Sequence, residues 1–188
     1  MKVQTATVRR LRDALLASGR RPSMVLSSAY EALARAGMLT PEESGALDRV
    51  DPLAETMFLM MAADGTVSEV ERDAVRGAIR GLTDNLLRSG TIDVMLEGYA
   101  KRLAEQGRDA RLHEIAEQLS EEPSEAEGAF ALAAAIALAD DEIDDAENEL
   151  VNQLAEWFGI APSRAEEILD QLDEDLDAED EPETDKAP

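Results

Sequence analysis

Two short acidic segments hold the residues of this chain that are best suited to chemistry, and that chemistry is cation binding by oxygen ligands. Residues 63–71 form the first acidic corner and residues 139–147 the second, and an offset of 76 residues aligns them without a gap. Calcium and magnesium bind through carboxylate and carbonyl oxygens. The repeat therefore indicates a candidate divalent-cation site that occurs twice. The aligned carboxylates are Asp64 with Asp140 and Glu71 with Glu147.

Each acidic corner connects the end of one apolar helix to the start of the next. Asp64 and Asp140 follow helix C-termini, where unpaired carbonyls leave partial negative charge, so a carboxylate there is unfavourable without a positive group nearby. Ser68 and Asp144 are good N-caps for the helices that follow, and the first turns of those helices hold the two glutamates. Side-chain and carbonyl oxygens thus converge at each corner.

Neither acidic corner is an EF-hand. That calcium loop requires glycine at its sixth position and glutamate at its twelfth. Counted from the first aspartate, these positions hold Glu69 and Val75 in one corner, Asp145 and Val151 in the other. Ordinary turn and capping rules also account for the corners, because Asp-Gly is a frequent turn pair and Ser-x-x-Glu is a capping box. A cation site and a purely local role therefore both remain open.

The elements that position the corners are predicted to be helices. The composition is rich in alanine and leucine and lacks strand-favouring runs. The apolar stripes that follow the two corners coincide at the same offset, which predicts two similar helix–loop–helix units about a pseudo-twofold axis. Residues 130–138 are apolar on nearly all sides and are expected to form a central buried helix. We expect the methionine-rich segment 57–61 to fill the core.

Capping and proline signals divide the rest of the chain. Thr40-Pro41-Glu42-Glu43 predicts the start of a short helix, and Asp51-Pro52 predicts the start of a separate apolar one. Further helices are predicted from Thr91 to about Gln106, from about Asp109 to Leu119, and after Pro162. His113 lies beside the apolar stripe of its helix and is expected at the surface.

Three segments are predicted: an N-terminal helical extension over residues 1–49, a compact helical domain over 50–172, and a disordered acidic tail over 173–188. Within the extension, residues 5–18 place Val8, Leu11, Leu15 and Leu16 at helical spacing with Arg9, Arg10 and Arg12 between them. We interpret this basic face as solvated surface, with contact to an anionic membrane or an acidic partner as the alternative.

The charge distribution argues against binding to nucleic-acid phosphates, because the net charge is −24. Residues 51–188 account for −27, while residues 1–50 carry +3.

The residue types also offer little for catalysis. The chain has no cysteine and one histidine, and it shows no phosphate-binding glycine loop and no nucleophile–base pair. We therefore expect a protein that is not an enzyme. No apolar run reaches membrane-spanning length and no signal sequence is apparent, so we expect a cytoplasmic protein.

At the acidic corners the chain resembles the tellurite resistance TerB family over residues 50–172. The family motif is an apolar helix, Ala-Asp-Gly-x-Ile/Val, a small or acidic residue, and a glutamate in the next helix. Residues 61–71 fit it closely, and residues 139–147 fit it with Asp141 in place of glycine. The resemblance implies a bundle of about seven helices with internal pseudo-symmetry, a role in stress resistance, and a divalent metal. The implied metal ligands are Asp64, Glu71, Asp140, Asp144 and Glu147.

These observations lead to one main hypothesis and one alternative. The main hypothesis is a non-enzymatic, tellurite-resistance-like stress-response module that binds calcium or magnesium at both corners. It would act through protein partners, with peripheral membrane association through a partner or the basic N-terminal helix, and without nucleic acid. The alternative is a structural or adaptor domain whose acidic surface and tail bind a basic protein, the corners serving only as turns and caps. A metal-assisted hydrolase is the least favoured class.

Overall fold

The computed structural model describes Arg12 and residues 39–63, 65, 67, 69–119, 122–138 and 145–180. Within these ranges the side chains of residues 70 and 175–180 are not described. Apart from Arg12, which is helical, the helix predicted over residues 5–18 lies outside the described residues.

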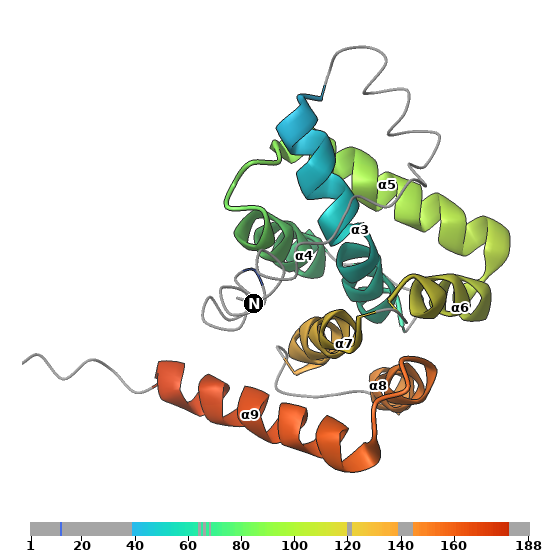
Figure 1. Ribbon diagram of the computed structural model, residues 1–188, viewed down its shortest axis with the longest axis vertical. Coiled ribbons are helices and arrows are strands. Elements are labelled where there is room, and N and C mark those ends of the chain that lie inside the picture. Colours follow the sequence, from blue (N-terminus) through green and yellow to red (C-terminus); the bar gives the residue numbers. More distant parts are fainter. Residues whose placement is uncertain are drawn as a thin grey trace, which may run out of the picture.

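The described residues form seven α-helices and contain no strand, which confirms the all-α prediction (Figure 1). The helices are α3 (Pro41–Met61), α4 (Glu69–Leu82), α5 (Ser89–Gln106), α6 (Arg108–Leu119), α7 (Pro123–Ala137), α8 (Asp145–Trp157) and α9 (Pro162–Asp180). Across the described ranges, no helix combines the length and apolarity that a membrane crossing needs.

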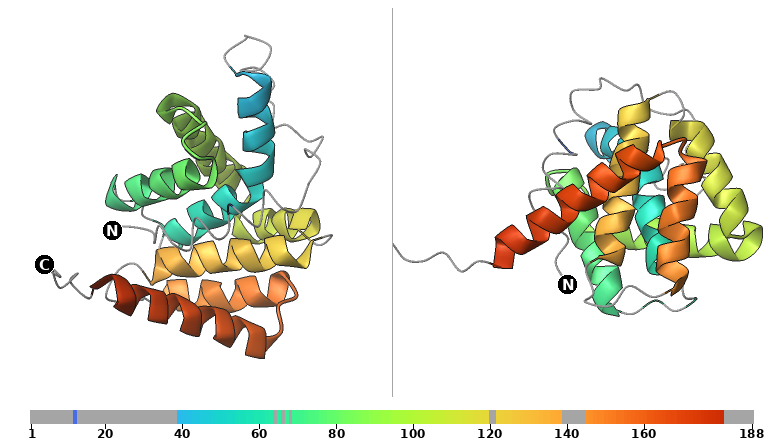
Figure 2. Two further views of the ribbon diagram at one scale, coloured as in Figure 1. Left: turned by 60° about the vertical axis from the view of Figure 1, so that its left-hand side comes forward. Right: turned by 90° about the horizontal axis from the view of Figure 1, so that it is seen from below.

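Helices α3 and α7 pack on each other at the centre of the bundle. Around them, α4, α5 and α6 contact α3, while α8 and α9 contact α7. Helices α7, α8 and α9 lie one over another on one side of the domain (Figure 2). This arrangement agrees with the prediction of a central apolar helix, because every residue of α7 from Gly128 to Ala137 is buried. The alanines of α7 carry almost no side chain, which permits the close approach of α3.

The methionine-rich end of α3 lies in the core, as predicted. Met57, Phe58, Met60 and Met61 are all 2 % exposed or less. The Phe58 ring meets that of Tyr99 at 5.8 Å between centroids. A flexible methionine fits irregular gaps between helices, and here the gaps are those between α3 and its neighbours.

Helix α3 begins as the capping box predicts but does not end where the sequence suggested. The Thr40 amide donates to Glu43 Oε2 at 2.7 Å, and the Glu43 amide donates to Thr40 Oγ1 at 3.1 Å. The prediction of a new helix at Asp51-Pro52 is wrong, since Pro52 lies inside a continuous α3. Asp51 does not act as an N-cap because its carboxylate accepts the Tyr99 hydroxyl at 2.9 Å.

Helix α9 runs farther than the sequence suggested, through Asp180 and so into the segment predicted to be a disordered tail. Leu172 is 4 % exposed and anchors its middle. Glutamate, leucine and alanine favour helix, and no proline interrupts the chain until Pro182. Residues 181–188 lie outside the described part of the chain.

Candidate cation-binding corners and a buried ion network

The first acidic corner is described in part. Helix α3 ends at Met61, and the Gly65 amide donates to the Ala62 carbonyl at 3.2 Å. Gly65 has a φ of 87°, a conformation that favours glycine. Glu71 lies half-buried in the first turn of α4, where a carboxylate is favourable. Asp64 and Ser68 lie outside the described residues.

A positive group contacts the end of α3. Arg108, at the start of α6, donates from Nη2 to the carbonyl oxygen of Ala63 at 2.6 Å. A guanidinium at a helix C-terminus compensates the partial negative charge of the unpaired carbonyls. The protein therefore supplies, at its first corner, the positive charge that the sequence pattern requires.

The second acidic corner is described only at its edges. Helix α7 ends at Ala137, and Leu138 donates its amide to the Ala134 carbonyl at 2.8 Å. Glu147 is half-buried in the first turn of α8. Asp140 and Asp144 lie outside the described residues.

The helices that flank the two corners share the offset of the sequence repeat. Met61 and Ala137 end the incoming helices, and Glu69 and Asp145 start the outgoing ones, in each case 76 residues apart. The outgoing helices bury equivalent positions, such as Ala74 with Leu150 and Ala78 with Leu154. The two units thus have matching boundaries, whereas their relation by a pseudo-twofold axis stays a prediction.

Of the five predicted metal ligands, the structure describes Glu71 and Glu147 alone. Among the described residues, no group of three or more Asp, Glu, His or Cys side chains is arranged to hold a metal ion. The loop aspartates needed to complete either site fall outside those residues, so the assignment of a metal to the corners stays a prediction.

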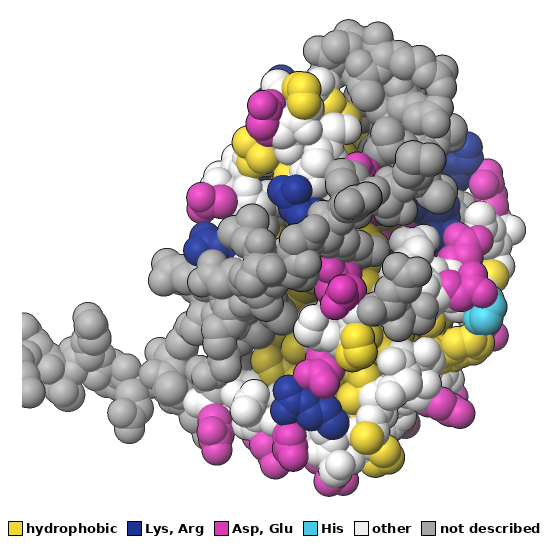
Figure 3. All heavy atoms as spheres, in the orientation of Figure 1, with side chains coloured by type: hydrophobic (Ala, Val, Ile, Leu, Met, Phe, Trp, Pro, Cys, Tyr) yellow, Lys and Arg dark blue, Asp and Glu magenta, His cyan; other side chains and the backbone are white. Residues whose placement is uncertain are grey.

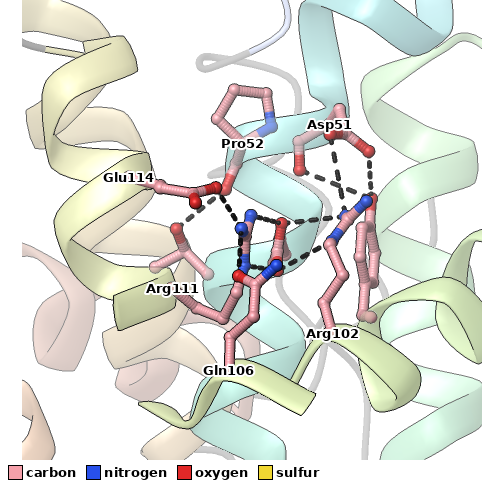
Figure 4. A network of polar contacts seen from close by, with 9 residues as sticks. Asp51, Pro52, Arg102, Gln106, Arg111 and Glu114 are labelled. Carbon is pink, nitrogen blue, oxygen red and sulfur yellow. Dashed lines mark hydrogen bonds and ion pairs between the residues drawn. The ribbon is translucent and has the colours of Figure 1, made fainter. Parts of the chain in front are cut away.

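Sequence reasoning missed a buried ion network beneath α3 (Figure 4). Glu55 is 1 % exposed, yet its carboxylate accepts hydrogen bonds from two arginines. Arg111 binds it through Nε at 2.8 Å and Nη2 at 2.9 Å. Arg102 binds it through Nε at 3.2 Å and Nη2 at 2.9 Å. One carboxylate thus joins α3 to both α5 and α6.

Other polar and aromatic groups surround this network. Arg111 Nη1 donates to Gln106 at 2.9 Å and also binds Glu114. The guanidinium of Arg102 lies 4.9 Å from the centre of the Tyr99 ring. Burial lowers the pKa of Arg111, but the hydrogen bond and charge of Glu55 outweigh it and raise that pKa above its ordinary value. Hydrogen bonds that support one another in this way stabilise a fold, so we assign the network a structural role.

The signal that could have revealed this network is a single glutamate in an apolar helix. Glu55 stands between Leu53 and the methionine-rich segment, and a buried carboxylate requires a partner. The partners lie 47 and 56 residues away in sequence, so the sequence could indicate that they exist but not which residues they are.

The only histidine lies on the surface, as expected. Its side chain is 59 % exposed, with Nε2 3.4 Å from Glu117 Oε1. Its ring packs edge-on against Trp157 of α8, with centroids 5.5 Å apart. These contacts connect α6 to α8 and give His113 no catalytic neighbour among the described residues.

Acidic side chains are spread over the surface, including the lower edge where α9 lies (Figure 3). Several carboxylates of α9 are exposed: Glu166, Glu167, Asp170, Asp173 and Glu174. An extended negative surface attracts cations and basic partners over distances set by the ionic strength.

The described residues define an all-α helical bundle, in which the helices that flank the two acidic corners start and end at matching positions. The family of the protein follows from a direct comparison: the model of the tellurite resistance protein TerB family matches residues 51–170. The chain belongs to this family, which confirms the resemblance seen in the sequence. No curated protein and no solved structure matched the chain.

Proposed function

We propose that this protein is a non-enzymatic, cytoplasmic stress-response module that binds a divalent cation at its acidic corners and acts through protein partners. The observation that carries the proposal is the match between the two units. In each unit an acidic segment connects the end of one helix to the start of the next, and the first turn of that second helix holds a half-buried glutamate, Glu71 or Glu147. Calcium and magnesium favour such a set of oxygen donors.

The two corners differ in charge, so we propose that the second one binds the cation more tightly. Residues 63–71 contain three carboxylates, and residues 139–147 contain six. Arg108 also contacts the first corner. Its guanidinium donates a hydrogen bond to the Ala63 carbonyl, and its positive charge repels a cation. In this proposal Asp140, Asp144 and Glu147 hold the tighter ion, while Asp64 and Glu71 hold the weaker one.

Calorimetric titration of the full-length chain with calcium chloride and magnesium chloride tests this proposal. Binding to the folded state also raises the melting temperature by mass action. The double variant Asp140→Asn, Asp144→Asn should lose most of the heat. The matched control is Glu166→Gln, Glu174→Gln, which removes the same charge from exposed positions of α9. No heat and no thermal shift at millimolar metal would refute the proposal, and equal losses in both variants would replace it with diffuse charge attraction.

A second function is favoured by the contact between Arg108 and Ala63, because a corner that already has its positive charge can serve simply as a turn. In that case the protein is an adaptor whose acidic surface and C-terminal residues bind a basic protein. Polylysine is a suitable probe, and its binding should weaken with salt. An adaptor binds polylysine equally well in the Asp140→Asn, Asp144→Asn variant and less well when residues 181–188 are removed.

A further inference from the structure

A cavity of about 210 Å³ opens between the first half of α3 and the end of α4, away from both acidic corners. Its floor is apolar, and its rim is charged. Leu86 at its edge is 41 % exposed, which is unusual for a large apolar side chain in this fold. The apolar lining consists of Ala46, Val50, Leu82 and Leu86.

The rim of this cavity includes a residue from the distant N-terminal segment. Arg12 lines the cavity, and its Nη1 lies 3.3 Å from Asp84 Oδ1. The Arg12 side chain is 26 % exposed, while that of Asp84 is 82 % exposed. A contact between residues 72 positions apart shows that the N-terminal segment reaches this surface at one point at least.

The turn after α4 is built to present Asp84. Asp84 and Asn85 have φ values of 51° and 61°, a region that these two residue types tolerate. The Asn85 amide donates to the Arg80 carbonyl at 2.8 Å and closes the end of α4. The carboxylate of Asp84 is therefore held at the rim by a turn that Asn could also adopt.

We propose that this cavity is the docking surface for the chain's own N-terminal segment, residues 5–18, bound as a basic amphipathic helix. In a helix, residues three and four apart share one face. Val8, Leu15 and Leu16 stand four, three and four positions from Arg12, so they share the face that carries Arg12. The pair of Arg12 with Asp84 anchors the segment beside the floor formed by Val50, Leu82 and Leu86, of which Leu86 is still 41 % exposed.

Charge complementarity favours this occupant. Residues 5–18 hold three arginines and one aspartate, a net charge of +2, and residues 51–188 carry −27, so the segment and the body attract each other. Docking at this cavity gives the basic segment a definite place on an acidic body. Docking at this cavity does not require cation binding at the acidic corners.

Cysteine cross-linking in the full-length chain tests the docking, because the native protein has no cysteine. The pair Leu15→Cys and Leu86→Cys places one thiol a helical turn beyond Arg12 and the other at the cavity edge. The matched control pairs Leu15→Cys with Glu166→Cys, an exposed position on α9. With a short bismaleimide at micromolar protein, the first pair should form an intramolecular cross-link several-fold faster than the control.

Removing the ion pair should weaken docking without disturbing the turn. In the Leu15→Cys, Leu86→Cys background, Asp84→Asn should slow cross-linking by up to about five-fold, the range of an exposed ion pair. Arg12→Gln should slow cross-linking less in the Asp84→Asn background than in the background of the two cysteines alone, because both changes break the same pair. Equal rates for the two cysteine pairs would overturn the proposal, as would a cross-link found only between two chains, which would identify a second copy as the occupant.

Discussion

Arg111 donates two parallel hydrogen bonds to the carboxylate of Glu55, from Nε to Oε1 at 2.8 Å and from Nη2 to Oε2 at 2.9 Å. Both residues are almost fully buried. Paired arginine–carboxylate geometry of this kind is strong and directional. It ties the start of α6 to the middle of α3, the helix at the centre of the bundle. The pair therefore fixes the position of the α5–α6 hairpin against the core.

Replacing Glu55 with alanine should destabilise the fold severely. The change leaves Arg111 buried without its carboxylate and removes the main partner of Arg102. Breaking a buried pair in this way costs about 3–5 kcal/mol, to be measured by urea denaturation. Glu105→Ala is a fitting control, because Glu105 pairs with Lys101 at 3.8 Å on the surface, and its loss should stay within about 0.5 kcal/mol. A small effect of Glu55→Ala would mean that the network contributes little to stability.

The ionised side chain of Glu43 should stabilise the protein at pH values above 4.5, the ordinary pKa of glutamate, and lose this effect in acid. The hydrogen bond from the Thr40 backbone, helped by Arg88, lowers its pKa below the ordinary 4.5. A lowered folded-state pKa means that the stabilisation is complete above 4.5 and disappears as pH falls through the lowered value. Glutamine preserves a capping box, so Glu43→Gln should fold. The difference in urea midpoint between wild type and Glu43→Gln should shrink in acid, and a constant difference would contradict this.

Asp48, one turn further along α3, should show the opposite dependence. Burial, together with the charge of Asp51, raises its pKa above the ordinary 3.8. The ionised form is therefore unfavourable in the folded state, and stability falls as pH rises from 3.8 through the raised value. Asp48→Asn should increase the urea midpoint at pH 7, and the gain should vanish below pH 3.8. A variant less stable than wild type at pH 7 would refute this reading of Asp48.

Arg108 should oppose cation binding at the first acidic corner. A chain that carries Asp140→Asn and Asp144→Asn lacks two of the three ligands proposed for the second corner, so the proposed site of the first corner is the intact one. Adding Arg108→Gln removes a positive charge from that corner and should tighten calcium binding by about five-fold, equivalent to on the order of 1 kcal/mol. The same change should lower the melting temperature without metal, because Ala63 loses its donor. Lys101→Gln, at an exposed position of α5 that pairs with Glu105, should leave the affinity unchanged.

Local patterns predicted most of this fold, and the exceptions have physical causes. The apolar run of α7 indicated a buried helix because no solvent-facing side was left for it. The Asp51-Pro52 pair looked like a helix start, since it satisfies the capping rules taken alone. A tertiary contact overrides that local preference, because the Tyr99 hydroxyl of α5 donates to Asp51 at 2.9 Å. Within α3 itself, the Thr56 hydroxyl donates to the Pro52 carbonyl at 2.8 Å. The proline is accommodated inside a helix that its neighbours hold in place.

The candidate site was only partly predictable from the sequence. The repeat correctly located both helix boundaries around each acidic corner, because caps and turn residues act over a few positions. It gave no indication of Arg108, which approaches Ala63 from a helix that starts 45 residues later. Contacts between distant segments depend on how helices pack, and short motifs carry little information about packing.

Helix α3 runs without a break across the residue at which the family match starts, so the start of the match is not the start of a structural element. The family match starts at residue 51, in the middle of a helix that begins at Pro41. A fragment cut there would lose the Thr40 cap and the buried side chains of Leu47 and Val50. The family match thus starts inside a helix and not at its N-terminus. Any swap of this domain between relatives therefore has to carry the preceding turns of α3 with it.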